Sequence, residues 1–374
     1  MSPAHVVGWG KYVPERVLSN DDLSEMVDTS DEWIRTRTGI AERRVAEDGE
    51  STASMATRAA WRALRAAGVT PAQVDLIIVA TATPDHAIPA TACIVQDALG
   101  ASNAAAFDLS AGCTGFVYAL GVAADMVAAR DGAGKKATAV VIGAETLSRF
   151  VDWTDRSTCV LFGDGAGAVV LQANGSPGGV LSTFLGADGS GGDLLYVPAG
   201  GSEEPASHRT VSQRLHYVRM RGREVFRFAV RAMPDAAQQV LEQAGLTPDD
   251  VDLLVPHQAN QRILEAAGRA LNLPPEKMYS NLERYGNTSA ASIPIALCEA
   301  VEEGRISRDD VVVCVGFGAG LTWGATALRW SVPLPTAPPT AWGKARYRVW
   351  RGYASVRSLI RRLVRWLLSR SVKE

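Results

Sequence analysis

The sequence predicts a duplicated α/β fold that is followed by a short extension of different character. Nearly continuous apolar runs, such as residues 74–80 and 139–143, are typical of strands in a mostly parallel sheet that helices cover on both faces. The sequence of residues 64–76 is similar to that of residues 241–253. The two stretches are separated by an offset of 177 residues, from 64 to 241. A repeat of this length indicates a duplicated domain and not a solenoid of short units.

The chain of 374 residues divides into four predicted segments. We expect a first half over residues 1–172, a second half over 173–330, a proline-rich linker over 331–342 and a basic tail over 343–374. The five cysteines show neither paired nor metal-ligand spacing, which suits a reducing cytoplasm. We expect neither a signal peptide nor a membrane-spanning stretch.

Helices and strands alternate through the first half. In order, we expect a strand over 5–8, a helix that begins near 19–20, helices over 51–67 and 89–99, and strands over 74–80, 139–143 and 168–171. Residues 162–167 carry three glycines, but their spacing fits neither a dinucleotide nor a P-loop pattern, so they predict a tight turn. Residues 186–220 predict a long, mobile, glycine-rich loop.

Residues 31–40 place Trp33 beside two arginines, Arg35 and Arg37. An exposed tryptophan here could stack on an adenine while the arginines meet phosphates. It could equally be an amphipathic side chain that packs its helix on the core. The residues alone leave both interpretations open.

Cys113 follows a short apolar run and a Ser-Ala-Gly turn, and a helical pattern of small and apolar residues begins just after it. Unpaired N–H groups and the helix dipole at such a helix start favour an anion. A thiol placed there should lose its proton more readily and act as a nucleophile. The alternative is a buried structural cysteine, which is the commoner fate of a lone one.

Two later stretches favour the nucleophile. His257 follows a short apolar run that ends in proline, and Asn287 sits in a Gly-Asn-Thr turn before a second small-residue helix. Side chains at three separate strand-to-helix junctions can converge on one point, so Cys113, His257 and Asn287 are candidates for one site.

Five motifs occur in a familiar order: Ala-Gly-Cys-Thr-Gly at 111–115, Phe-Gly-Asp-Gly-Ala-Gly at 162–167, Pro-His-Gln-Ala-Asn at 256–260, Tyr-Gly-Asn-Thr-Ser at 285–289 and Gly-Phe-Gly-Ala-Gly-Leu-Thr-Trp at 316–323. With them the chain resembles the β-ketoacyl-acyl-carrier-protein synthases III, condensing enzymes of the thiolase fold, over about residues 5–330. The resemblance implies a thiolase-like five-layer αβαβα architecture.

The resemblance also implies a reaction in two halves. Cys113 would take an acyl group from acyl-coenzyme A, and malonyl-acyl carrier protein would then lose CO₂ and attack the acyl-cysteine. His257 and Asn287 would stabilise the enolate. The backbone N–H groups of Cys113 and Gly318 would form the oxyanion hole, with Phe317 packed beside the cysteine.

Further roles follow from the same resemblance. Trp33, Arg37, Arg156, Asn260, Phe226 and Gly222 would bind coenzyme A and its pantetheine arm; Ile88, Phe317 and Met220 would line the acyl pocket; and Arg262, Arg227 and Arg269 would contact the carrier protein. Ser157 stands where the family usually has glycine, which weakens the nucleotide fit. The family forms homodimers, in which strand 139–143 would pair across the two-fold axis and Ile88 would reach the partner's pocket. We expect no metal, no cofactor beyond the coenzyme A thioester substrate and no nucleic acid.

Two other functions stay open at this point. A related acyltransferase would move the acyl group to an alcohol or amine without condensation, but such relatives usually alter the histidine or the asparagine. A catalytically silent subunit of a heterodimer would not need an intact Cys113. Priming condensation is therefore the favoured interpretation.

The tail lies beyond the resemblance. It holds ten basic residues and one acid, which leaves +9 in the tail and −11 in residues 1–342 of a chain whose net charge is −2. Seven apolar residues share one helical face: Val356, Leu359, Ile360, Leu363, Val364, Leu367 and Leu368. A basic amphipathic helix is typical of a membrane-surface binder. Alternatively its apolar face docks on the protein's own acidic body or on a second copy, or the tail captures acidic carrier protein.

Overall fold

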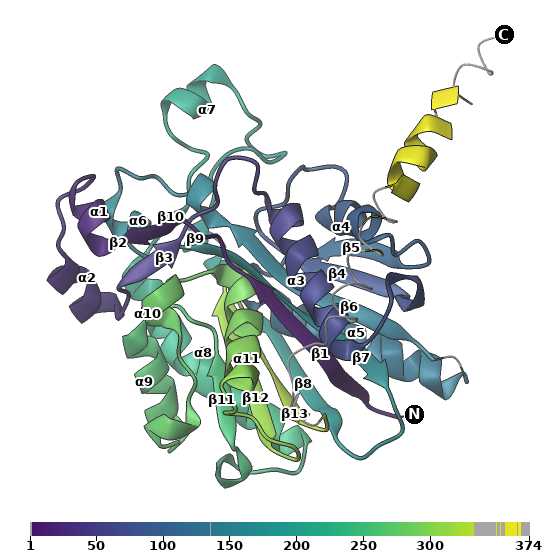
Figure 1. The fold of residues 1–374 in the computed structure, drawn as a ribbon. Coiled ribbons are helices and arrows are strands. Elements are labelled where there is room, and N and C mark those ends of the chain that lie inside the picture. Colours follow the sequence, from purple (N-terminus) through teal and green to yellow (C-terminus); the bar gives the residue numbers. More distant parts are fainter. Residues whose placement is uncertain are drawn as a thin grey trace.

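The computed structural model describes residues 2–134, 136–332, 349, 352, 356–364, 366 and 367. Two sheets are stacked with helices outside and between them, so that the order of layers is α, β, α, β, α (Figure 1). The duplicated five-layer architecture expected from the sequence is confirmed.

The first sheet has the strand order β1-β7-β6-β4-β5. Its strands are β1 (Ala4–Tyr12), β4 (Leu76–Ala80), β5 (Ala105–Leu109), β6 (Thr138–Thr146) and β7 (Asp164–Ala173). β4 runs parallel to β5 and β6, whereas β7 is antiparallel to β1 and β6. Helices α3 (Thr52–Ala67) and α4 (Thr91–Leu99) cover its outer face.

The second sheet has the order β11-β12-β13-β8. Its strands are β8 (Gly179–Ala187), β11 (Leu253–Pro256), β12 (Val311–Gly318) and β13 (Thr322–Arg329). Helix α8 (Gly222–Gln243) packs on β12 and β13, and α9 (Gln261–Ala270) packs on α8 (Figure 1).

Two helices lie between the sheets, α5 (Gly115–Gly132) and α11 (Ser292–Glu302). Each begins directly after one turn of 3-10 helix, η2 (Gly112–Thr114) before α5 and η7 (Ser289–Ala291) before α11. The offset of 177 residues places η2 on η7, so the two halves share this junction. The segment Gly112–Gly132 is long and apolar enough to cross a membrane, but it forms the buried centre of the fold.

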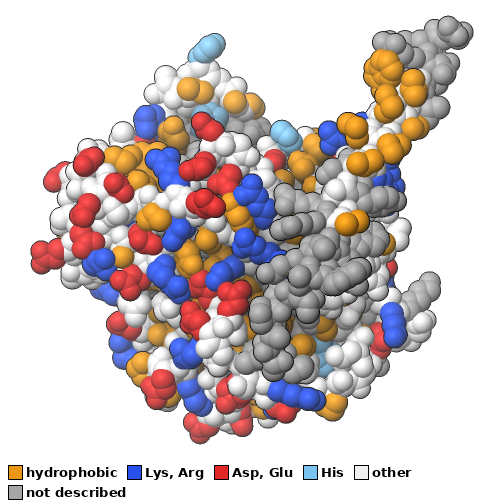
Figure 2. All heavy atoms as spheres, in the orientation of Figure 1, with side chains coloured by type: hydrophobic (Ala, Val, Ile, Leu, Met, Phe, Trp, Pro, Cys, Tyr) orange, Lys and Arg blue, Asp and Glu red, His pale blue; other side chains and the backbone are white. Residues whose placement is uncertain are grey.

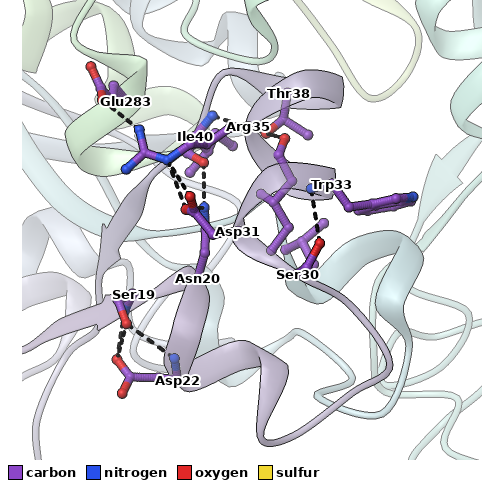
Figure 3. A network of polar contacts seen from close by, with 12 residues as sticks. Ser19, Asn20, Asp22, Ser30, Asp31, Trp33, Arg35, Thr38, Ile40 and Glu283 are labelled. Atoms are coloured by element: carbon purple, nitrogen blue, oxygen red, sulfur yellow. Dashed lines mark hydrogen bonds and ion pairs between the residues drawn. The ribbon is translucent and has the colours of Figure 1, made fainter.

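Shorter elements close one end of the molecule. They are β2 (Val17–Ser19), α1 (Asn20–Ser24), α2 (Asp31–Thr38), β3 (Glu42–Arg44), α6 (Arg156–Cys159) and α10 (Leu282–Tyr285). Ser19 caps α1 through a capping box and Ser30 caps α2. Arg35 bridges Asp31 and Glu283, which ties α2 to α10 (Figure 3).

Three local expectations are wrong. β6 lies between β4 and β7, so strand 139–143 has no open edge to pair with a partner subunit; the edge strands of this sheet are β1 and β5. β7 begins at Asp164, so most of 162–167 is strand and not turn. Residues 186–220 contain β9 (Leu195–Tyr196), α7 (His208–Ser212) and β10 (Arg219–Met220) and are not a continuous loop.

The proline-rich linker and much of the tail lie outside the described residues. Residues 356–364 are helical and extend away from the body beside α4 (Figure 1). Ser358 and Arg362 contact Asp97 at 2.6 and 3.3 Å. The apolar side chains point outward (Figure 2): Val356, Leu359, Ile360, Leu363 and Val364 are 46–70% exposed. In the described part of the tail, a polar edge and not the apolar face meets the body.

Candidate active site

Cys113 lies in η2, where the chain passes from β5 into α5. Gly112 before it has a φ of +53° and lies so close to Ala319 that a Cβ would come within 2.8 Å of the Ala319 nitrogen. Glycine is therefore required here by both conformation and space. The turn holds the thiol in the middle layer of the fold, with the residue 6% exposed.

The end of β12 packs directly on the cysteine. A Cβ on Gly318 would lie 2.5 Å from the Cys113 nitrogen, so only glycine allows this approach. A Cβ on Gly316 would lie 3.6 Å from the His257 Cβ and 3.7 Å from the Thr114 Cα. The stretch Gly316–Gly318 is thus the contact surface between the cysteine turn and the histidine.

His257 follows β11, and its backbone N–H donates to the Val315 carbonyl at 2.8 Å. Its Nδ1 lies 2.6 Å from the Ser292 Oγ, while its buried Nε2 has no hydrogen-bond partner among the described residues. The Phe317 ring meets the imidazole edge-on at 5.3 Å between centroids. Burial lowers the pKa of His257 to about 3, so the imidazole is neutral at physiological pH.

Asn287 lies between α10 and η7. Its backbone is fixed by hydrogen bonds to Leu161 and Gly163 at 2.8 and 3.0 Å. Its Oδ1 accepts the Ser289 N–H at 2.8 Å, which orients the side-chain amide. Ser289 itself has a φ of +48°, in the left-handed region that few non-glycine residues adopt.

Ser289, on the turn that packs against the cysteine turn, donates its hydroxyl to the buried Glu145 Oε1 at 3.0 Å. Turns η2 and η7 pack against each other, and Gly316–Gly318 lies between the cysteine turn and His257, so the structure brings Cys113, His257 and Asn287 into one region. The sequence analysis missed Glu145, Ser289 and Ser292. The available signals were a carboxyl at the end of a buried strand and two serines beside the Asn287 motif.

The environment of the thiol differs from the sequence expectation. Burial raises the pKa of Cys113 to about 12, and the charge of Glu145 adds to the effect. The hydrogen bond from Ser289 acts in the opposite direction. Desolvation is the largest of the causes that act on this thiol.

The predicted nucleotide residues gather at the end of α2. The guanidinium groups of Arg37 and Arg156 lie 4.8 and 4.7 Å from the Trp33 ring centroid. The ring points away from the polar network that anchors α2 (Figure 3). Asn260 caps α9 and donates to the Arg37 carbonyl at 3.0 Å, while Arg262 lies over the Phe226 ring at 5.4 Å. Contacts therefore link Arg156, Trp33, Arg37, Asn260, Arg262 and Phe226 into one row of side chains, here called the rim, which runs from α2 to α9 and α8.

The other predicted residues are more dispersed. A Cβ on Gly222 would lie 3.7 Å from the Met220 methyl, so these two are neighbours where β10 meets α8. Arg227 on α8 and Arg269 on α9 are exposed. Ile88 is 88% exposed in the loop between β4 and α4, on the outside of this chain. Among the described residues no cluster of three or more His, Cys, Asp or Glu side chains is placed to hold a metal ion.

Known proteins support one family. The family model for 3-oxoacyl-[acyl-carrier-protein] synthase III matches residues 107–189, and that for its C-terminal part matches 241–330. A β-ketoacyl-[acyl-carrier-protein] synthase III of Symbiobacterium thermophilum is 60% identical over 328 residues, which are 88% of this chain and 98% of the relative.

Solved structures agree. The 3-oxoacyl-[acyl-carrier-protein] synthase III of Aquifex aeolicus has a TM-score of 0.79 at 50% identity, covering 87% of this chain and all of that one. The corresponding enzyme of Pseudomonas aeruginosa has a TM-score of 0.81 at 44% identity, covering 89% of this chain and all of that one. The chain therefore belongs to the 3-oxoacyl-[acyl-carrier-protein] synthase III family of thiolase-fold condensing enzymes.

Proposed function

We propose that the protein condenses an acyl-coenzyme A primer with malonyl-acyl carrier protein, with loss of CO₂, to give a 3-oxoacyl-acyl carrier protein. The reaction starts fatty acid or polyketide synthesis and passes through an acyl-Cys113 intermediate. The observation that carries the proposal is the convergence of Cys113 after β5, the His257 Nε2 after β11, which has no partner among the described residues, and the oriented amide of Asn287 between α10 and η7.

In the acylation half, the Cys113 sulfur attacks the thioester carbon and coenzyme A leaves. Negative charge develops on the thioester oxygen. The backbone N–H groups of Cys113 and Gly318 are the proposed donors to that oxygen, and the tight packing of β12 on η2 supports this assignment because it fixes both groups in advance.

In the condensation half, His257 and Asn287 donate to the oxygen of the malonyl thioester while CO₂ leaves. Ser292 Oγ lies 2.6 Å from the His257 Nδ1 and accepts the Gln258 N–H at 3.4 Å, and we propose that it donates its own hydrogen to that nitrogen. The imidazole then carries its proton on Nε2, the atom that faces the site as a donor. Because the Asn287 Oδ1 is already engaged, its NH₂ group is the part of the amide left for the substrate.

The rim residues would bind the substrates. Trp33, Arg37 and Arg156 suit an adenine and its phosphates, while Asn260, Phe226, Gly222 and Met220 suit the pantetheine arm and the acyl chain. Arg262, Arg227 and Arg269 suit the acidic surface of a carrier protein. The coenzyme A thioester acts as substrate, and we propose that no further cofactor takes part.

Mass spectrometry of the protein after incubation with a range of acyl-coenzyme A primers tests the proposal. We expect an acyl adduct on Cys113, and CO₂ release once malonyl-acyl carrier protein is added. An adduct without any CO₂ release would instead favour acyl transfer to an alcohol or amine. No adduct with any primer would overturn both functions.

A homodimer is the proposed assembly. β5 is an edge strand of the first sheet, and Ile88 is exposed in the loop before α4. Pairing of two β5 edges would remove an unpaired strand edge and place Ile88 in the partner's acyl pocket. Light scattering at micromolar concentration should give a dimer, and a fully active monomer would contradict the assignment.

The tail is proposed to hold the enzyme, otherwise cytoplasmic, at an anionic membrane surface. Its outward apolar face and its basic residues support this interpretation, and the family models end at residue 330, before the tail begins. Each basic residue near an anionic surface contributes about 1 kcal/mol, less as salt is added.

Vesicle co-sedimentation tests the membrane contact. We expect full-length protein to bind anionic vesicles in a salt-sensitive way, and binding to disappear on deletion after Trp342 or with Leu359→Asp. Condensing activity on soluble substrates should remain. Equal vesicle binding by the truncated protein would contradict the proposal, and a larger assembly that depends on the tail would favour contact between copies.

A further inference from the structure

Glu145 is a buried carboxyl at the end of β6 that the proposed reaction does not use. The loop after β4 holds one side of it: the Ala82 N–H donates at 3.1 Å, and the Thr81 and Thr83 hydroxyls donate at 3.2 and 2.6 Å. A further donor is the Ser289 hydroxyl, at 3.0 Å, from turn η7 in the other half of the fold. The carboxyl thus connects the first sheet to η7.

Strand β6 meets η7 at two neighbouring points on one face. Gly143 and Glu145 are two residues apart in the strand, so both face the central layer. A Cβ on Gly143 would overlap the Ala290 carbonyl oxygen, which means that only glycine allows the turn to come this close. Two residues further along, Glu145 accepts the Ser289 hydroxyl. β6 therefore fixes two consecutive residues of η7.

Ser289 has a backbone conformation that needs such support. Its φ of +48° lies in the left-handed region, which is unfavourable for residues other than glycine and persists where surrounding contacts hold it. In this conformation its N–H donates to the Asn287 Oδ1 at 2.8 Å. The Asn287 backbone is held separately, by Leu161 and Gly163. The conformation of Ser289 therefore sets the orientation of the Asn287 amide.

We infer that Glu145 is a positioning residue for Asn287 and acts through Ser289. This inference rests on the proposed role of Asn287 in decarboxylation. A half-turn of the amide would exchange its NH₂ group for its carbonyl oxygen with little change in shape. An oxygen turned toward the malonyl thioester would repel the enolate and not stabilise it. Because the Ser289 N–H binds Oδ1, the amide presents its NH₂ group to the substrate.

A buried acid with a purely structural role would behave differently. Its loss would weaken the fold and slow both halves of the reaction together. Loss of a positioning residue would slow decarboxylation, which uses the Asn287 amide, and spare acylation of Cys113, which does not. The quantity to measure is therefore the ratio of the two rates, with acylation followed by the mass of the adduct and decarboxylation by CO₂ release from malonyl-acyl carrier protein.

Two substitutions at Ser289 separate backbone conformation from loss of the hydroxyl. Ser289→Ala removes the bond to Glu145 and keeps a Cβ that disfavours the positive φ, so decarboxylation should fall about tenfold, less than on complete loss of an oxyanion donor. Ser289→Gly also removes the hydroxyl, but glycine adopts a positive φ unaided, so decarboxylation should stay within about threefold of wild type. Acylation should be nearly unchanged in both. Equal decarboxylation by the two variants, or an equal fall in both steps, would overturn the inference.

A rescue experiment tests Glu145 itself. Glu145→Ala should slow decarboxylation about tenfold and spare acylation. Adding Ser289→Gly should recover most of the loss, because glycine does not need the carboxyl to hold the turn. In an Asn287→Ala background, Glu145→Ala should have little further effect on CO₂ release, since it acts through the missing amide. Independent multiplication of the Glu145→Ala and Asn287→Ala effects would overturn the inference.

Asp108→Asn is the control. The Asp108 carboxyl lies on β5 of the same sheet and accepts the N–H groups of Thr91 and Ala92 at 2.6 and 2.7 Å, at the start of α4. Both rates should stay near wild type in this variant. If Glu145→Ala fails to fold, the two Ser289 variants still decide the inference. Wild-type protein that forms no acyl adduct, or releases no CO₂, would instead overturn the proposed function itself.

Discussion

The two halves of the fold place different chemistry on the same scaffold. Turn η2 carries Cys113, and at the equivalent position of turn η7 stands Ala290. The relation reverses on the neighbouring strands, where His257 follows β11 and its equivalent at the end of β4 is Ala80. Each half therefore supplies the functional residue that its counterpart replaces with alanine.

The strands that follow the central helices differ in the same complementary way. Val79 pairs with Ile142 in the first sheet, and its equivalent Pro256 pairs with Val315 in the second, so Glu145 on β6 is equivalent to Gly318 on β12. Gly318 lets the backbone reach Cys113, whereas Glu145 reaches Ser289 in the opposite turn. Duplication thus gives a symmetric frame, and the site arises from the differences within it.

The largest expected effect is loss of the nucleophile that distinguishes η2 from η7. Cys113→Ala should reduce acyl transfer by at least about 10³-fold, because the proposed reaction passes through an acyl-Cys113 intermediate. The fold should persist, since only a sulfur atom is removed. Cys298→Ala, a buried thiol on α11, is the control and should keep the adduct. Normal condensation by Cys113→Ala would make the central assignment wrong.

The next largest effect distinguishes the roles of His257 and Asn287, which lie in the second half of the fold, from the role of Cys113 in the first half. His257→Ala and Asn287→Ala should each slow decarboxylation by about 10²–10³-fold and leave Cys113 acylation nearly intact. The reason is that both donors act on the malonyl oxygen and not on the first leaving group. Adduct formation and CO₂ release should be measured separately. Lost acylation with unchanged decarboxylation would reverse the assignment.

A smaller effect concerns the pH dependence of the free energy of unfolding. His257 has an imidazole that can titrate, whereas its equivalent in the first half, Ala80, has none. Burial lowers the pKa of His257 to about 3, below its unfolded value near 6.5. The unfolded state then binds more protons as pH falls below 6.5, so stability is fully present above that pH and declines toward 3. Between pH 7 and 5 this group should cost about 2 kcal/mol. Denaturant unfolding of wild type and His257→Asn isolates it; equal pH slopes would argue against the buried neutral ring.

Much of this arrangement was predictable from residues close together in sequence. The repeat predicted the duplicated frame, local signals predicted helices that begin near Ser19 and Ser51, and the three short motifs predicted that Cys113, His257 and Asn287 share a site. These features depend on local pattern, which a single sequence contains.

The rest depends on contacts between distant segments. Glu145 and Ser289 are 144 residues apart in sequence, so their hydrogen bond follows only from the stacking of the two halves. The raised pKa of Cys113 follows from its burial between the sheets. The position of β6 inside its sheet likewise depends on strand order, and an apolar run alone does not distinguish a central strand from an edge.

The smallest expected effect tests whether position in the turn is enough to make a nucleophile. Ala290 is fully buried. A Cβ on Gly115 of α5 would lie 3.6 Å from the Ala290 Cβ, so the Ala290 side chain points into the core between the central helices. Ala290→Cys should lower the free energy of unfolding by about 1–3 kcal/mol through overpacking and leave condensation unchanged.

In a Cys113→Ala background the new thiol should remain unmodified by acyl-coenzyme A, as judged by the mass of the peptide that contains residue 290. Gly143 of β6 approaches the Ala290 carbonyl, but the position equivalent to Gly318 is Glu145, so a thiol at residue 290 would lack the donors proposed for Cys113. An acyl adduct on residue 290 would mean that the turn itself, and not its surroundings, creates the reactivity.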